Sequence, residues 1–395
     1  MYGRSLAALA ALLGGCGFNV GAGVGVAIDA ADGPGSDPDA PTDGPATDAP
    51  VVSIDAPLDG PASTKRRMRL SFKNANRNVG LDGFVVLVAL DPTNVDYSLI
   101  KAGGANIRFV DTDGTVLPYQ IDEWVAGGTS LVWVRVPLID ALSDTDHIFM
   151  HYGDPALNDA QNATGTWAGY AGVYHLSQDP GPGGIGEIRD SSPGARHATA
   201  TPVMTSADRV AAIVGNGFRL PGNGAGITAL STTMPTYTWS MWIMGTTAPA
   251  MLSSNKEPIN NGDLNFNFAW DHSQAAFVGA AAHRDATAWR SAAPGGMAAN
   301  TWYFVAGTYN GTNLCVYRDN TAAACTAAGA PLAPNGGGLL IGHAASGAAT
   351  FNGWIDEVHL TTTAFGSLRL DAEFVNQKHD AANPFVVFGA PEVIP

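Results

Sequence analysis

The stretch 351-FNGWIDEVHL-360 decides the fold of the second half of the chain. Apolar residues such as Trp354 and Val358 alternate in it with polar ones, which is the pattern of a β-strand with one buried face. Asp356 and Glu357 interrupt this apolar strand. A buried carboxylate is costly unless a hydrogen bond, an opposite charge or a metal ion satisfies it. The rest of the chain should therefore supply a partner for this acidic pair.

Neighbouring residues on a strand point to opposite faces of the sheet. We therefore expect the Asp356 side chain to point towards a neighbouring loop that it helps to organise. The Glu357 side chain should point to the opposite face of the sheet, where it is solvated or forms an ion pair. Glycosidases need two carboxylates that face one substrate, so this pair does not predict hydrolysis. The Gly-x-Ser-x-Gly, His-Glu-x-x-His and P-loop motifs are absent as well. We expect a protein that is not an enzyme.

The composition favours a chain built from strands and turns. Its 395 residues include 48 glycines, 46% are hydrophobic and only 14% are charged. Abundant glycine and few charges suit turn-rich β-structure better than helical bundles. No sustained helical pattern appears beyond the N-terminus. We expect an all-β protein.

Residues 1–16 have the pattern of an export signal. Arg4 precedes the apolar run 6–13, and small residues follow, so the segment is too short to span a bilayer. The tetrapeptide Leu-Gly-Gly-Cys that ends at Cys16 resembles the bacterial lipobox, which implies a lipid on this cysteine. With Gly17 next, the resemblance implies an exported protein that is lipid-anchored at the outer membrane or cell surface. The alternative is an ordinary export signal with an incidental cysteine.

Residues 17–63 consist largely of repeated Asp-Ala-Pro and Asp-Gly-Pro units. Proline bars helices and central strands, like charges repel, and little of the segment can be buried. We therefore expect a disordered tether that holds folded domains away from a membrane. The tether carries much of the net charge of −15. This acidity argues against nucleic acid or anionic lipid as a partner, so contact with a membrane is expected through the lipid anchor alone.

Residues 65–156 predict a β-sandwich, because strand patterns alternate with turns at short intervals. The strand patterns occupy 67–72, 83–90, 107–110, 117–124, 130–136 and 147–153. The segments 106-NIRFVDTDG-114, 117-LPYQIDEW-124 and 132-VWVRVP-137, in this order, resemble a bacterial domain of unknown function. That domain often precedes laminin-G-like modules in secreted surface proteins. The resemblance implies no activity for this domain.

A larger domain is predicted over residues 170–391, where several landmarks follow one another. They are 172-GVYHL-176, the loop from Asp190 to His197, 214-VGNGFRL-220, 237-YTWSMWI-243, 301-TWYFVAGTYNG-311 and 339-LLIG-342, followed by the strand of Asp356. This succession resembles the concanavalin A-like, laminin-G-type jelly roll of bacterial surface proteins. The resemblance implies a jelly-roll fold over the whole segment.

The resemblance also implies a structural calcium ion, which often sits in one part of such jelly rolls. Asp190 should then lie near Asp356, with Asn216 and Gly217 as further backbone contributors. Carboxylate and carbonyl oxygens are the ligands that Ca²⁺ prefers. The alternative is that Asp356 only accepts hydrogen bonds from backbone N–H groups of a neighbouring loop and binds no ion.

Cys315 and Cys325 lie at equal distances on either side of Asn320. A hairpin that turns at Asn320 places them opposite each other, within disulfide reach if the pair is not hydrogen-bonded. Export favours oxidation, and a lipid on Cys16 leaves an even number of thiols. We predict a disulfide between Cys315 and Cys325.

Two other sequence patterns suggest metal sites, but their residues do not have the spacing that metal ligands require. The turn 111-DTDG-114 begins like an EF-hand loop but lacks the later ligands, so a hairpin turn is the better interpretation. His147 and His151 would share one face of a helix, but they lie on a predicted strand, where four residues span about 13 Å. Neither pattern predicts a metal site.

Tryptophans are the candidates for a sugar-binding surface, because the C–H faces of sugars pack on aromatic rings. Trp270 and Trp289 have polar neighbours and are the predicted ligand-facing residues, whereas Trp239 and Trp242 lie in apolar strands and are predicted core. We expect a non-catalytic cell-surface lipoprotein that binds a glycan or another surface protein. Two alternatives stay open: a structural protein of the cell envelope without a glycan ligand, and a glycan-active hydrolase.

Overall fold

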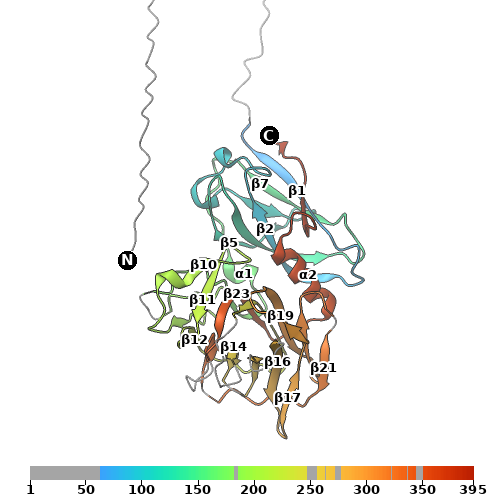
Figure 1. Ribbon diagram of the computed structural model, residues 1–395. Helices are drawn as coiled ribbons and strands as arrows, with labels where there is room; N and C mark the ends of the chain where they lie inside the picture. The colour runs from blue at the N-terminus through green and yellow to red at the C-terminus, as the bar shows by residue number, and fades with distance from the viewer. Residues whose placement is uncertain are drawn as a thin grey trace, which may run out of the picture. The chain divides into compact units, whose positions relative to one another are not determined.

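The computed structural model describes residues 63–181, 186–246, 256–262, 264–271, 277–321, 323–335, 337–343 and 350–395. The described part of the chain is nearly all β, with 42% strand and 8% helix, which confirms the predicted fold class (Figure 1). Cys16, the predicted signal and the predicted tether up to residue 62 lie outside the described residues. Within the described part, no helix is long and apolar enough to cross a membrane.

Two sheets form the first domain. One contains, in spatial order, β24 (Val386–Phe388), β1 (Arg66–Phe72), β7 (His147–Tyr152), β3 (Arg108–Val110) and β4 (Val116–Leu117), and β25 (Glu392–Val393) also pairs with β1. The other contains β2 (Leu81–Leu90), β6 (Ser130–Ile139) and β5 (Tyr119–Glu123). Buried apolar side chains from both sheets, such as Phe72, Phe84 and Val132, pack into one core. This architecture is the β-sandwich that the sequence predicts.

The end of the chain completes the first domain. β24 pairs with β1 in antiparallel register, from Leu70 opposite Phe388 to Phe72 opposite Val386. This strand falls within 170–391, the segment that the sequence assigns to the jelly roll. A three-residue apolar strand gives no indication of which sheet it joins, because its partner β1 lies more than 300 residues away in the sequence.

Two antiparallel sheets form the second domain. The first contains β10 (Arg209–Ala211), β11 (Asn216–Pro221), β23 (Asn352–Thr361), β13 (Tyr237–Gly245), β19 (Tyr303–Tyr309), β20 (Asn313–Arg318) and β21 (Ala324–Ala327), and β8 (Tyr170–Tyr174) also pairs with β23. The second contains β17 (Trp289–Ala292), β16 (Phe277–Arg284), β15 (Phe266–Asp271), β14 (Lys256–Asn261), β22 (Leu339–Ile341), β12 (Ile227–Ala229) and β9 (Thr199–Ala200), and β18 (Gly296–Met297) pairs with β16. Residues from both sheets, including Trp239, Ile355, Phe268 and Ile341, form the core between them.

The helices are few and short in the described chain. They are η1 (Tyr97–Leu99), η2 (Ala102–Gly104), α1 (Ala163–Thr166), η3 (Ser206–Asp208) and α2 (Ser367–Lys378). Helix α2 covers part of the outer face of the β23 sheet, where Leu370 packs with Trp242 and Phe304. Another part of that face is covered by the first domain, because Val173 of β8 packs with Trp133 of β6.

A β-bulge interrupts β23 at the acidic pair. Ser240 pairs with His359 and Trp242 pairs with Asp356, so β23 has one residue more than β13 between these two positions. Glu357, inside this interval, has φ of 49°, in the left-handed region of the backbone. A bulge adds one unpaired residue to a strand and shifts the alternation of its side chains.

This shift corrects the prediction that Asp356 and Glu357 point to opposite faces. Ile355 before the bulge and Val358 after it both belong to the core of the second domain. The two acidic residues between them turn away from that core, Asp356 towards Val214 and Glu357 towards histidine side chains. The sequence does carry a signal of the bulge, because two core residues three positions apart do not fit regular alternation.

Candidate functional site

Trp289 is the largest exposed aromatic side chain among the described residues. It begins β17 and is 50% exposed. Its partner in register on β16 is Arg284. Ala292 of the same strand is in the core, so Trp289 and Ser291 face outward. Trp289 and Arg284 are therefore cross-strand neighbours on the outer face of the second sheet.

A row of mostly polar residues crosses this outer face near Trp289. Phe268, Ala281 and Ile259 point into the core, so their strand neighbours point outward. Pairing between strands aligns these neighbours in one row: Ser291, Ala282, Asn267, Asn260, Leu340 and Thr228. The two ends of the row are exposed and its centre is buried. We call Trp289, Arg284, Ser291 and Asn267, at the β17 end, the outer-face site.

Asn267 gives the outer-face site a hydrogen-bonding group without a protein partner. Its side-chain oxygen Oδ1 is buried and accepts no hydrogen bond from any described residue. A buried amide oxygen without a donor is costly unless a water molecule or a ligand supplies one. Hydroxyl groups of a sugar are donors of this kind, and an exposed indole beside them is a stacking surface for the sugar ring.

Asp285 fixes the hairpin that presents Trp289. Its Oδ1 accepts hydrogen bonds from the backbone N–H groups of Thr287, at 2.8 Å, and Ala288, at 2.7 Å. Its Oδ2 accepts one from Nε of Arg290 at 2.6 Å. Hydrogen bonds from Arg290, from the Thr287 hydroxyl and from the backbone hold the pKa of the Asp285 carboxyl well below its usual range. The carboxylate therefore stays ionised and keeps the turn in one conformation.

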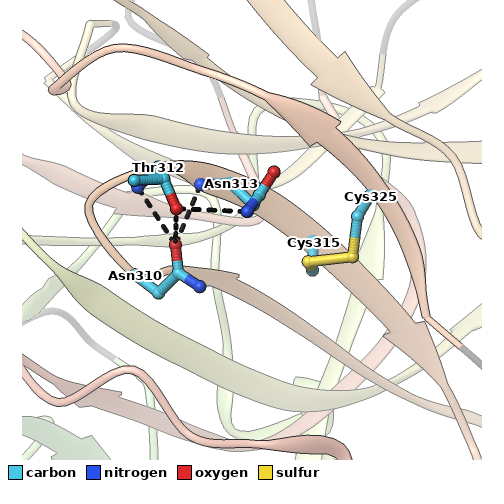
Figure 2. The surroundings of a disulfide bond; sticks show 5 residues. All are labelled: Asn310, Thr312, Asn313, Cys315 and Cys325. Atoms are coloured by element: carbon cyan, nitrogen blue, oxygen red, sulfur yellow. Dashed lines mark hydrogen bonds between the residues drawn. A yellow bond between two sulfur atoms is a disulfide. The ribbon is translucent and has the colours of Figure 1, made fainter.

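The predicted disulfide is confirmed. Cys315 of β20 pairs with Cys325 of β21, and their Cα atoms lie 4.1 Å apart, the spacing of a pair that is not hydrogen-bonded (Figure 2). Nearby, the Asn310 side chain accepts hydrogen bonds from the backbone N–H groups of Thr312 and Asn313 and so closes the turn before β20. β17 contacts both β20 and β21, so the disulfide braces the edge next to Trp289.

Glu357 lies in a buried cluster with two histidines. Its carboxylate is 2.8 Å from Nδ1 of His175 and 2.8 Å from Nε2 of His359. Burial lowers the pKa of His175, but the nearby Glu357 and Asp122 carboxylates outweigh this effect and raise it to about 9. Burial by itself raises the pKa of Glu357, yet the two histidines hold it below its usual value. His175 and His359 are the site residues that sequence reasoning missed, because only the bulge turns residues 357 and 359 away from the core.

The residues predicted to hold calcium have protein partners. Asp190 Oδ1 accepts hydrogen bonds from the N–H groups of Val173 and Ser192, and its Oδ2 accepts from Ser192 Oγ and Arg196 N. Asp356 Oδ2 accepts one from Val214 N at 2.8 Å. Burial and the neighbouring Glu357 carboxylate raise the pKa of Asp356 well above its usual range. These contacts are of the kind expected if the carboxylates accept from backbone N–H groups, and calcium binding stays a prediction.

The other predicted positions are placed as follows. Asn216 donates through Nδ2 to Glu123 Oε1 at 3.1 Å, and Gly217 pairs with Val210 on β10. Trp239 and Trp242 are buried. The side chain of Trp270 lies outside the part of the chain that the structure describes.

Comparison with family models identifies both domains. Residues 221–367 match the concanavalin A-like lectin/glucanases superfamily, and residues 103–179 match a domain of unknown function, DUF2341. The predicted order of the two domains is therefore confirmed. No curated protein matches the chain.

Several solved structures resemble the chain distantly. Domain 4 of the extracellular arabinanase AbnA from Geobacillus stearothermophilus, in complex with arabinotriose, has 14% identity and a TM-score of 0.39, covering 51% of this chain and 96% of that one. Trypanosoma rangeli sialidase also has 14% identity and a TM-score of 0.39, covering 70% of this chain and 45% of that one. The ligand-binding domain of botulinum neurotoxin serotype D, in complex with N-acetylneuraminic acid, has 12% identity and a TM-score of 0.40, covering 54% and 52%. Structural similarities this distant give no information about function.

Proposed function

We propose that this chain, which carries a DUF2341 domain followed by a concanavalin A-like lectin/glucanase domain, binds a carbohydrate at the outer-face site without cleaving it. The observation that carries the proposal is the exposed Trp289 ring on the same outer face as Arg284 and Ser291, with Asn267 one strand further across the sheet. A flat apolar ring next to polar donors and acceptors is the combination that a sugar requires, because its C–H faces stack and its hydroxyl groups form hydrogen bonds.

The location of the site supports the proposal. The β23 sheet has its outer face packed against α2 and the first domain, so that face is occupied by protein. The exposed end of the opposite sheet is stiffened by the Asp285 turn and by the disulfide. A rigid platform loses little conformational entropy when a ligand binds.

The charges on this face argue against cleavage. A glycosidase needs two carboxylates on the substrate-facing surface. Asp285, the carboxylate of the turn that presents Trp289, is engaged by that turn, and the side chains of Glu257 and Asp271 on the second sheet lie outside the described residues. The site therefore supports binding, with hydrolysis as the alternative to be tested.

A glycan array with the purified chain tests the proposal. We expect a defined set of glycans to bind, and Trp289→Ala to weaken their binding by about tenfold or more, the loss typical of a stacking aromatic. Leu138→Ala is the matched control, because Leu138 is 52% exposed and lies in the first domain. A blank array would contradict glycan binding and favour the alternative of a structural or assembly protein of the cell envelope without a glycan ligand. Release of free sugar from a bound glycan would contradict the non-catalytic part.

Export and lipid anchoring are the second part of the proposal. A disulfide is typical of proteins that leave the reducing cytoplasm, and the Cys315–Cys325 bond supports this placement. The lipobox-like sequence at Cys16 supports a lipid anchor at the outer membrane or cell surface. Metabolic labelling with palmitate should mark the wild type and not Cys16→Ser. Equal labelling of the two proteins, or none of either, would contradict the lipid anchor.

A further inference from the structure

Three potential metal ligands converge where the two domains meet. A ring nitrogen of His175, a ring nitrogen of His359 and a carboxylate oxygen of Glu357 all lie within 4.8 Å of one another. His175 directly follows β8, and the other two residues are on β23, which pairs with β8. Imidazole nitrogens with one carboxylate form a ligand set of Zn²⁺, whereas Ca²⁺ takes oxygen ligands. We propose that His175, Glu357 and His359 bind one divalent transition-metal ion of the zinc type.

The cluster is closed to solvent. His175 is 1% exposed, His359 is 3% exposed and Glu357 is fully buried. The indole of Trp133, from the first domain, stacks on the His175 ring at 5.7 Å, and the Trp167 ring lies 4.9 Å from that of His359. A dry aromatic wall around the ligands is typical of a metal site that stabilises a fold, because it keeps competing water away.

Several buried polar atoms next to the cluster lack partners among the described residues. They include Nε2 of His175, Oδ2 of Asp122, Oδ1 of Asp356 and Nε1 of Trp133. The hydrogen bond from Ser177, two residues after His175, holds Asp122 near the cluster. A histidine that binds metal through one nitrogen usually donates the other N–H to a carboxylate, which orients the ring. No hydrogen bond joins His175 Nε2 to Asp122 Oδ2 in this structure, but Asp122, whose Oδ1 accepts from Ser177 Oγ at 2.8 Å, is the carboxylate that we expect to take that positioning role when the ion binds.

The bulge in β23 is the feature that builds the site. With regular alternation from Ile355, residues 357 and 359 would point into the core of the second domain. The extra residue turns both towards the first domain, at the expense of a left-handed backbone at Glu357. Backbone strain at a non-glycine residue commonly marks a functional position.

The test uses the purified chain without a polyhistidine tag. The protein is stripped of metal with EDTA, incubated with zinc and dialysed against metal-free buffer. The zinc content per chain is then measured by elemental mass spectrometry. We expect about one zinc ion per chain to remain and the thermal midpoint to rise relative to the stripped protein. Cobalt(II), added to the stripped wild type, should give the visible absorption bands of a site with nitrogen and oxygen ligands, a readout that needs no variant.

Variants locate the ion. Glu357→Gln and His359→Asn should each lose the retained zinc and the cobalt bands, and Asp122→Asn should weaken the affinity by roughly 10- to 100-fold. His283→Gln is the matched control, because His283 is buried in the second domain and bonded to Tyr237 and Gly329, away from the cluster. It should retain zinc even though it destabilises the domain.

Three results would overturn the proposal. The wild type retains no zinc and shows no cobalt bands, or zinc retention is the same in Glu357→Gln and His359→Asn as in the wild type, or His283→Gln loses the ion to the same extent as they do. The first result would identify the cluster as an ion pair alone. Glycan binding at the outer-face site does not involve these residues, so each proposal can fail independently of the other.

Discussion

Gly307 allows a buried tryptophan to lie flat against β19. It pairs with Trp239 of β13, and a Cβ atom at this position would come within 2.3 Å of the indole ring. Trp239 is fully buried and cannot move aside. Gly307→Ala should therefore lower the free energy of unfolding by about 1–3 kcal/mol through overpacking.

Urea denaturation with fluorescence detection measures the effect of Gly307→Ala. Gly366→Ala is the control, since nothing lies within 4 Å of the added methyl group. Gly366 is the N-cap of α2, so the control should lose less than about 1 kcal/mol. An equal loss in both variants would contradict the overpacking argument.

Asp285 makes the stability of the chain depend on acid pH in a definite direction. Its pKa in the folded chain is depressed, so its contribution is present above the pKa of the unfolded chain and is lost as the pH falls through the folded value. Asp285→Asn should lower the urea midpoint at pH 7, and the difference from the wild type should shrink below about pH 4. A constant difference down to pH 2 would contradict a charge effect. Asp140→Asn, at an exposed position, is the control and should leave the urea midpoint unchanged both at pH 7 and at acid pH.

At the scale of single residues, the sequence predicts a contact when the spacing within one hairpin determines it. The positions of Cys315 and Cys325 about Asn320 are enough to predict the disulfide, because a hairpin register is a local property. The environment of Glu357 is different. Its two histidine partners depend on a bulge and on a strand more than 180 residues earlier in the sequence, and alternation alone predicts the wrong face.

Among the elements, the hairpin of β20 and β21 depends most on a covalent bond. β21 is the last strand of its sheet and has one strand partner in the described chain. The disulfide closes a loop with a sequence separation of 10. In the chain-entropy model, loops of this length gain up to about 3 kcal/mol from the bond. Replacing both cysteines by serine should therefore lower the thermal midpoint and expose the β21 amides to hydrogen exchange.

Exchange measured with and without a reductant checks the hairpin prediction. Protection of the β21 amides should fall after reduction, while that of β23, at the centre of the sheet, should stay unchanged. Uniform loss of protection across both strands would mean that the disulfide supports the whole domain. No change in either strand would contradict a stabilising role.

Strand patterns within one sheet are predictable from sequence, whereas the joining of distant strands is not. The predicted strands at 83–90 and 130–136 fall within β2 and β6, because long apolar runs between turns have few other interpretations. β24 and β25 are too short to carry a pattern, and their partner is set by β1 at the far end of the chain. The domain limits therefore follow tertiary contacts that periodicity does not encode.

For the molecule as a whole, the two domains share buried contacts. Residues 60–395 form one compact unit. Asn376 of α2 accepts a hydrogen bond from Leu87 N at 2.7 Å and donates one to Leu87 O at 2.9 Å, so the helix binds the backbone of β2. Trp133 and Trp167 pack with Val173 and Val214 in a cluster that spans both domains. Neither domain buries these groups by itself.

We therefore expect residues 60–395 to unfold in one cooperative transition, although the sequence predicts two domains. Calorimetry should give one peak with equal calorimetric and van't Hoff enthalpies. Asn376→Ala leaves the N–H and C=O of Leu87 without partners, which costs about 1–3 kcal/mol for each buried group, and should move the whole peak to lower temperature. Asn383→Ala, an exposed substitution just beyond the helix, should leave it in place. Two peaks, of which Asn376→Ala shifts only one, would show that the domains unfold separately and that the shared cluster does not couple them.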